Sequence, residues 1–105
     1  MKIIIDECVP HIVKKELPNH NIKTVQEMGW SGVKNGELLK LILTEFDVFI
    51  TSDKNLRFQQ NLEELKLSVI LLPGNQIPVI KALLPQIEDV LKKKPLESFT
   101  EIQSD

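Results

Sequence analysis

The chain has 105 residues and a mass of 12.0 kDa, which suits a single domain with one hydrophobic core. Hydrophobic residues make up 42% and charged residues 27%, a composition typical of globular proteins and too apolar for a disordered chain. The net charge is −2 and Arg57 is the only arginine, which argues against a protein that binds nucleic acid through a basic surface alone. Contact with phosphate is therefore expected to need local lysines or a bridging cation.

Membrane and disulfide-stabilised classes are also excluded by the sequence. No stretch approaches the ~20 apolar residues of a membrane span, and the apolar run Ile3–Ile5 is too short for a signal peptide. Cys8 is the only cysteine, so an internal disulfide is ruled out and a cytoplasmic location is expected. Since free cysteines are most often buried, we interpret Cys8 as a small core residue.

Strand-like and helix-like segments alternate along the chain. In order, the sequence predicts a strand at 2–5, a helix at 10–17, a strand at 22–25, a helix at 35–46, a strand at 48–51, a helix at 56–65, a strand at 67–72, a helix from 78 and a short edge strand at 98–103. The last helix is apolar on one broad face, and Pro85 is expected to kink it. This alternation predicts a single α/β domain over 1–105, with a mainly parallel sheet and helices on both faces.

Two of the predicted strands run directly into acidic residues, at Asp6-Glu7 and at Thr51-Ser52-Asp53. In open α/β sheets the functional crevice lies beyond the carboxyl ends of the strands. If these two strands are neighbours, Asp6 and Asp53 lie side by side across a spacing of ~4.8 Å. Two carboxylates that close repel each other unless a cation joins them, and Mg²⁺ or Mn²⁺ takes such oxygen ligands. A local turn or helix cap is the alternative role for each aspartate.

Three further residues are candidates for the same site. Glu37, in the first turn of the helix at 35–46, is a third candidate carboxylate, although the helix dipole favours an acid there without any function. Thr51 is expected to orient the carboxylate of Asp53, and Asn55 offers a neutral oxygen. Local turn hydrogen bonds are the alternative for Thr51 and Asn55.

Basic and aromatic residues near these acids are candidates for substrate binding. Lys34, Lys54 and Arg57 flank the acids in sequence and are expected to contact phosphates; a solvated surface is the alternative for each. Trp30, in a loop between Gly29 and Gly32, is a candidate for stacking on a base, whereas packing on the core is the commoner role of such a residue.

Three stretches of the chain carry a family resemblance: IIIDECVP at 3–10, EMGWSGVKNGELLKL at 27–41 and FDVFITSDKNLRFQQNL at 46–62. Together they resemble the PIN-like family of small metal-dependent ribonucleases, in its shortened branch related to the toxins of toxin–antitoxin pairs. The resemblance implies a three-layer α/β/α sandwich with the sheet order 2-1-3-4. It also implies that Asp6, Glu37 and Asp53 bind one or two Mg²⁺ or Mn²⁺ ions, which activate water to cleave single-stranded RNA. An antitoxin partner and a homodimer are expected on the same ground; the exposed sheet edge and the apolar helix after Pro78 also favour a homodimer.

The chain departs from the family pattern in its acidic set. Longer members carry a further acid that is missing here, and Asn55 and Leu56 stand where many relatives have Asp-Phe. Glu7 is a possible replacement ligand. A PIN-like module that binds RNA or a protein without cleaving RNA is therefore the main alternative. A receiver-like phosphoacceptor domain is a more distant one, because that class needs a hydroxyl residue after strand four and a lysine after strand five.

Overall fold

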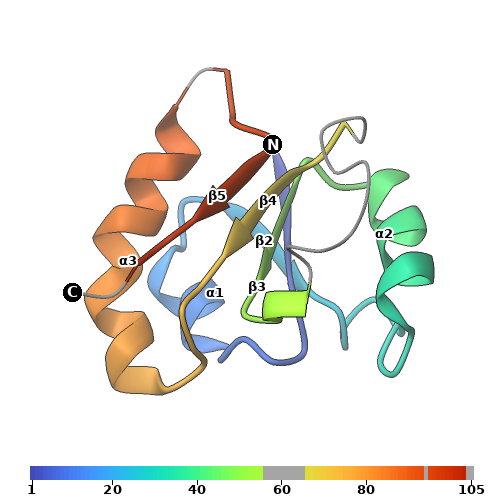
Figure 1. The fold of residues 1–105 in the computed structure, drawn as a ribbon, viewed down its shortest axis with the longest axis horizontal. Helices are drawn as coiled ribbons and strands as arrows, with labels where there is room; N and C mark the ends of the chain where they lie inside the picture. The colour runs from blue at the N-terminus through green and yellow to red at the C-terminus, as the bar shows by residue number, and fades with distance from the viewer. Residues whose placement is uncertain (56–65, 94, 104–105) are drawn as a thin grey trace.

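The computed structural model describes residues 1–55, 66–93 and 95–103, which form an α/β domain around a five-stranded parallel sheet (Figure 1). The strands are β1 (Lys2–Ile5), β2 (Asn21–Thr24), β3 (Val48–Thr51), β4 (Ser68–Leu71) and β5 (Phe99–Glu101). The helices are α1 (Ile12–Glu16), α2 (Asn35–Leu43) and α3 (Ile77–Lys92). The sheet order is β2-β1-β3-β4-β5, and every neighbouring pair is parallel. The predicted α/β class, the order 2-1-3-4 and the edge strand within 98–103 are confirmed.

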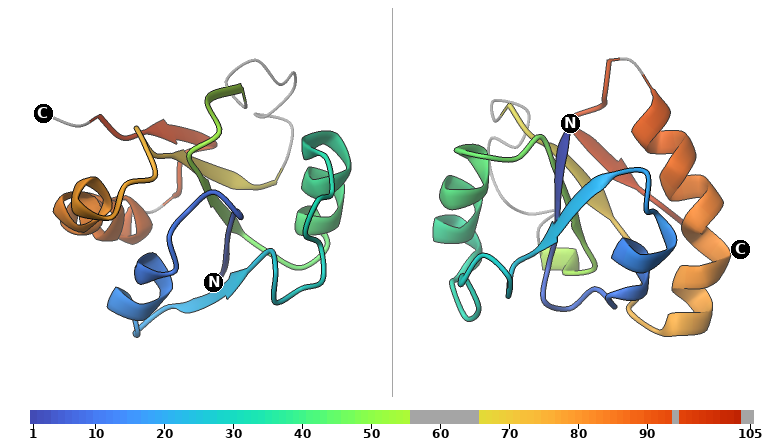
Figure 2. Two further views of the ribbon diagram at one scale, coloured as in Figure 1. Left: turned by 90° about the horizontal axis from the view of Figure 1, so that it is seen from below. Right: turned by 180° about the vertical axis from the view of Figure 1, so that it is seen from behind.

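The helices cover both faces of the sheet, which makes three layers. α1 and α3 lie on one face and α2 lies on the other (Figure 2). Each interface has its own apolar cluster: Ile3, Ile5, Val48 and Ile50 face α1 and α3, whereas Ile4 and Phe49 pack with α2. Successive side chains of a strand point to opposite faces, so a continuous apolar run is needed to fill both layers.

The two central strands, β1 and β3, are buried on both faces, which explains why their sequences are continuous apolar runs. Ile3, Ile4 and Ile5 of β1 are fully buried, and all four residues of β3 are buried, including the polar Thr51. Ile5 pairs with Ile50 in the β1–β3 register. The residues that follow these two strands therefore emerge next to each other at the carboxyl edge of the sheet.

Several helix bounds differ from those predicted. α1 begins at Ile12, two residues after Pro10, and α2 ends at Leu43, where the hydroxyl of Thr44 donates to the Leu41 carbonyl oxygen at 2.7 Å. α3 begins at Ile77 and continues through Pro85 to Lys92. The predicted helix at 56–65 lies outside the described residues.

The apolar side of α3 faces the sheet. Its residues Ile80, Leu83, Ile87 and Leu91 are buried in the core. This side is therefore not available for a dimer contact, and the predicted homodimer loses one of its two structural arguments. Among the described residues, no helix is both long enough and apolar enough to cross a membrane.

Candidate functional site

Asp6 and Thr51 lie side by side at the carboxyl edge of the sheet. The backbone N–H of Asp6 donates to the Ile50 carbonyl oxygen at 2.9 Å, which extends the β1–β3 pairing by one residue. The chain then turns, and the N–H of Val9 donates to the Asp6 carbonyl oxygen at 3.0 Å. Asp6 is partly exposed, whereas Thr51 beside it is fully buried. The edge of the sheet therefore holds the Asp6 side chain beside the buried Thr51, where the carboxylate is partly open to solvent.

The carboxylate of Asp6 is held by three donors. The Thr51 hydroxyl donates to Asp6 Oδ2 at 2.7 Å, and the Cys8 thiol lies 3.7 Å from the same oxygen. The backbone N–H of Glu7 donates to Asp6 Oδ1 at 2.8 Å. Hydrogen bonds at both oxygens fix the orientation of the carboxylate.

The role predicted for Thr51 needs correction. Its hydroxyl orients the carboxylate of Asp6, across the strand pair, and not that of Asp53 in its own strand. It also accepts a hydrogen bond from the backbone N–H of Asp53 at 3.0 Å. The cause is geometric: Thr51 ends β3 next to the end of β1, so its hydroxyl lies within hydrogen-bond distance of the charged Asp6, which follows β1. One buried hydroxyl therefore links Asp6 to the backbone of Asp53.

Asp53 forms a turn directly after β3. Its Oδ1 accepts the backbone N–H of Asn55 at 3.0 Å, the pattern of an Asx turn. Asp53 is partly buried, and Lys54 and Asn55 are exposed. The structure thus brings Asp53 to the same edge of the sheet as Asp6, and it shows that the turn-forming role also applies.

Sequence reasoning missed two members of this cluster, Cys8 and Ser52. The Ser52 hydroxyl donates to Cys8 Sγ at 3.1 Å, and Cys8 Sγ also lies 3.7 Å from Thr51 Oγ1. Cys8 packs against the α1/α3 core, as expected, but it is only partly buried. The sequence signal that could have revealed Cys8 was its position two residues after Asp6, where a turn brings the thiol close to the carboxylate.

Glu7 connects the turn after β1 to the loop after β2. Its Oε1 accepts the backbone N–H of Gly32 at 2.6 Å. Gly29 and Gly32 have φ angles of +77° and +81°, a conformation that other residues adopt only with strain, so the loop needs both glycines. Between them, Trp30 packs edge to face on Phe46, with ring centroids 6.2 Å apart. The packing role of Trp30 is thus the one observed, and base stacking stays a prediction.

Glu37 and Lys34 lie at the start of α2, and both are exposed. This end of α2 is on the side of the carboxyl ends of the strands, because helices in parallel α/β units run opposite to the strands (Figure 1). Within the described ranges, however, no three His, Cys, Asp or Glu side chains are close enough together to hold a metal ion. The structure thus places Asp6 and Asp53 at one edge without gathering Glu37 into a three-carboxylate group.

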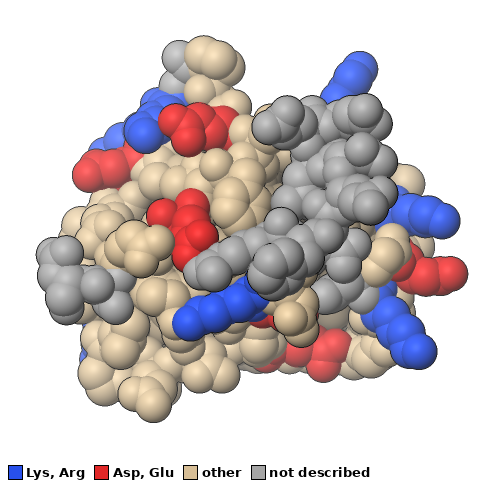
Figure 3. All heavy atoms as spheres, in the orientation of Figure 1, with Lys and Arg blue, Asp and Glu red and all other residues tan. Residues whose placement is uncertain are grey.

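The charges around the site are mixed. Figure 3 shows acidic and basic side chains interspersed over the described part of one face of the molecule. Lys34 and Lys54 are exposed and available to solvent, and Arg57 lies outside the described residues. On the described part of this face, a nucleic acid would therefore meet individual lysines instead of a broad basic surface.

No family model, no curated protein and no solved structure matches this chain. The family resemblance therefore rests on the three sequence stretches quoted above.

Proposed function

We propose that this protein is a metal-dependent endoribonuclease of the PIN-like type, which uses Asp6 and Asp53 to bind Mg²⁺ or Mn²⁺. The observation that carries the proposal is the link between these residues. Asp6 and Asp53 follow adjacent parallel strands, and the buried Thr51 hydroxyl bonds to the carboxylate of one and the backbone of the other. Ligand sites in open parallel sheets lie at this edge.

The donor set fits a hard divalent cation. Mg²⁺ commonly uses only one or two carboxylates, with the remaining positions filled by water and by phosphates of the substrate. Two acids at this edge are therefore a sufficient protein contribution, with Glu37, Glu7 and Asn55 as candidate additional ligands. The Cys8 thiol beside Asp6 is a soft ligand and does not suit Mg²⁺.

The proposed roles of the residues follow from their positions. A bound divalent cation supplies Lewis acidity and an activated water for displacement at phosphorus. Thr51 and the Glu7 N–H keep the Asp6 carboxylate in one orientation, which limits the reorganisation needed on binding. Lys34 and Lys54 would contact flanking phosphates and add affinity; Arg57 and Trp30 keep their predicted roles in substrate binding.

A non-catalytic PIN-like module is the second candidate. The absence of a three-acid group among the described residues favours it. The receiver-like alternative has less support. Receiver domains share the sheet order 2-1-3-4-5 with this protein. That class, however, needs a hydroxyl residue at the end of β4 and a lysine at the end of β5, where this protein has Leu71 and Glu101.

The proposal includes a cytoplasmic toxin with an antitoxin partner, and a homodimer formed through an exposed sheet edge. β2 and β5 are the edge strands in the described sheet. Light scattering at high micromolar concentration is expected to give twice the mass of 12.0 kDa. A monomer mass there would exclude the homodimer.

The test of function is cleavage of a mixed single-stranded RNA pool. We expect cleavage with Mg²⁺ or Mn²⁺, none with EDTA, and a loss of at least ~100-fold in Asp6→Asn or Asp53→Asn, since each removes a metal-binding charge. Asp89→Asn is the matched control, because Asp89 is an exposed acid on α3, away from this edge. Intact RNA in the presence of Mn²⁺, or normal cleavage by Asp53→Asn, would leave the non-catalytic module as the better assignment.

A further inference from the structure

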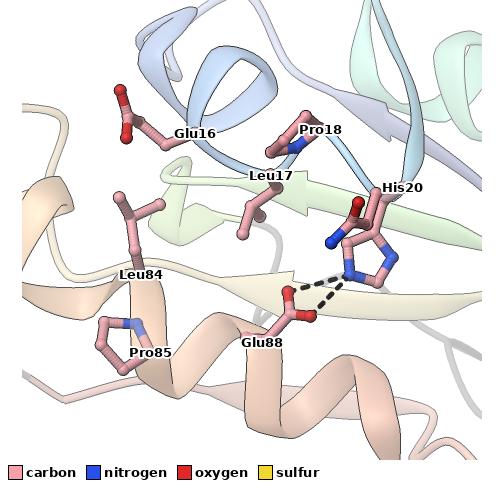
Figure 4. A pocket seen from close by; sticks show the side chains of 8 residues that line it. Glu16, Leu17, Pro18, His20, Leu84, Pro85 and Glu88 are labelled. Carbon is pink, nitrogen blue, oxygen red and sulfur yellow. Dashed lines mark hydrogen bonds and ion pairs between the residues drawn. The ribbon is translucent and has the colours of Figure 1, made fainter.

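A pocket lies between the end of α1 and the middle of α3, on the face of the sheet opposite to α2. Its volume is about 280 Å³, and its apolar walls come from Leu17, Pro18, Leu84 and Pro85 (Figure 4). The loop that lines it leads into β2, so the pocket is near the amino edge of the parallel sheet. It is therefore separate from the edge that holds Asp6 and Asp53.

Two side chains from different elements form the polar floor of this pocket. His20 Nε2 lies 3.0 Å and 2.9 Å from the two carboxylate oxygens of Glu88, as Figure 4 shows. The side chains of His20 and Glu88 are only 17% and 28% exposed. A carboxylate has about four acceptor positions. A contact with one ring nitrogen thus leaves Glu88 able to accept further hydrogen bonds from a ligand.

The other polar side chains that line the pocket are those of Glu16 and Asn19; the carboxylate accepts hydrogen bonds, and the amide both donates and accepts them. Glu16 contributes an exposed carboxylate from the last residue of α1. Among the described residues, those that line the pocket include two acids and no lysine or arginine. A ligand for this pocket should therefore be cationic, rich in hydrogen-bond donors and attached to an apolar stem.

We propose that this pocket binds an arginine side chain on an aliphatic segment of a partner protein. A guanidinium has five N–H donors in a planar fork, which suits a carboxylate better than the compact ammonium of lysine does. Its methylene stem would pack on Leu84 and Pro85, and its plane can stack on the His20 ring.

The test is an NMR titration of the ¹⁵N-labelled full chain with the peptide acetyl-Leu-Arg-Leu-amide. We expect saturable shifts of the amide signals of residues 16, 17, 19, 20, 84 and 88. The same peptide with citrulline in place of arginine should bind at least about tenfold more weakly, because citrulline keeps the shape but loses the charge. Peptide binding without shifts at these amides, or equal affinity for the citrulline peptide, would overturn the proposal.

Two variants separate binding from folding. Glu88→Gln should weaken the arginine peptide about tenfold, and Glu16→Gln should weaken it less, because Glu16 is exposed and its attraction is screened. Because Glu16 is exposed, the Glu16→Gln variant should fold normally, so it tests the proposal even if Glu88→Gln alters the fold. Glu97→Gln is the matched control, as Glu97 is an exposed acid whose nearby cation is Lys93, outside the pocket. Unchanged affinity in both Glu88→Gln and Glu16→Gln contradicts the proposal, whatever the result for RNA cleavage.

Discussion

The hydroxyl of Thr51 donates a 2.7 Å hydrogen bond to the carboxylate of Asp6, so a buried residue of β3 orients the acid that follows β1. The same hydroxyl oxygen accepts the N–H of Asp53 at 3.0 Å. Thr51 therefore uses both its donor and an acceptor position within the protein. This arrangement explains why a polar residue ends an otherwise apolar, fully buried strand.

Replacing Thr51 by valine tests this link. Thr51→Val keeps the shape of the side chain but removes the Thr51 oxygen that accepts the Asp53 N–H and the hydroxyl that donates to Asp6. We expect a loss of about 1–3 kcal/mol in the free energy of unfolding, measured by urea denaturation. Thr51→Ser retains the hydroxyl and should lose less than the valine variant. Equal stability of Thr51→Val and the wild type would show that the hydrogen bonds contribute nothing net.

The ion pair between Lys14 and Glu27 predicts a specific pH dependence. The hydrogen bond from Lys14 is the main reason why the pKa of Glu27 lies below its ordinary value of 4.5; the Thr24 N–H lowers it further, whereas desolvation acts in the opposite direction. A lowered pKa in the folded state means that the pair stabilises the protein above the pKa of unfolded Glu27. This contribution is lost as the pH falls through the folded-state pKa.

The measurement is a ¹³C NMR titration of the Glu27 carboxyl group. Lys14→Met should raise the Glu27 pKa toward 4.5 and reduce the loss of stability on acidification. The change in stability should be small, because both side chains are about 40% exposed. A Glu27 pKa that is the same in Lys14→Met and in the wild type would refute the assigned cause.

Pro85 lowers the stability of α3. It lies in the interior of a 16-residue helix and is exposed, so alanine can replace it without loss of core packing. Pro85→Ala restores the N–H that bonds to the Lys81 carbonyl, and we expect a gain of about 1–3 kcal/mol in the free energy of unfolding. The greater entropy of the unfolded alanine chain reduces this gain by roughly 0.4–1 kcal/mol. A lower melting temperature for Pro85→Ala would show that the proline ring makes contacts more valuable than that hydrogen bond.

The sheet could be predicted from the sequence because its centre is dictated by simple patterns. Ile3–Ile5 and Val48–Ile50 are short, continuous apolar runs of the kind that a strand covered on both faces buries completely. Strand positions and the parallel order followed from these runs, the alternation with helices and the family resemblance. The helix ends were harder: Phe46 is apolar and buried but lies beyond the end of α2, so periodicity extended the predicted helix too far.

The details of the site depended on contacts between strands, which one strand's pattern does not contain. The alternation of side chains along β3 gives the face toward which Thr51 points. Whether its hydroxyl donates to Asp6 or to Asp53 depends on the β1–β3 register. Cys8 joined the cluster because the turn after Asp6 brings its thiol back toward Thr51 and Ser52. The position of Glu37 on α2 was predicted correctly from the sequence. Its distance from Asp6 could not be predicted, because it depends on a loop whose sequence has no regular pattern.

Binding of Mn²⁺, measured by isothermal titration calorimetry, is the most direct test of the claim that Asp6 and Asp53 form a metal site. We predict saturable binding of one or two ions by the wild type. Asp6→Asn and Asp53→Asn should each weaken it at least about tenfold, since the charge of the ligands controls affinity for hard cations. Circular dichroism should show that the variants stay folded, and Asp89→Asn should bind as the wild type does. A wild type that binds no Mn²⁺, or an Asp6→Asn, Asp53→Asn double variant that binds it normally, would contradict the claim.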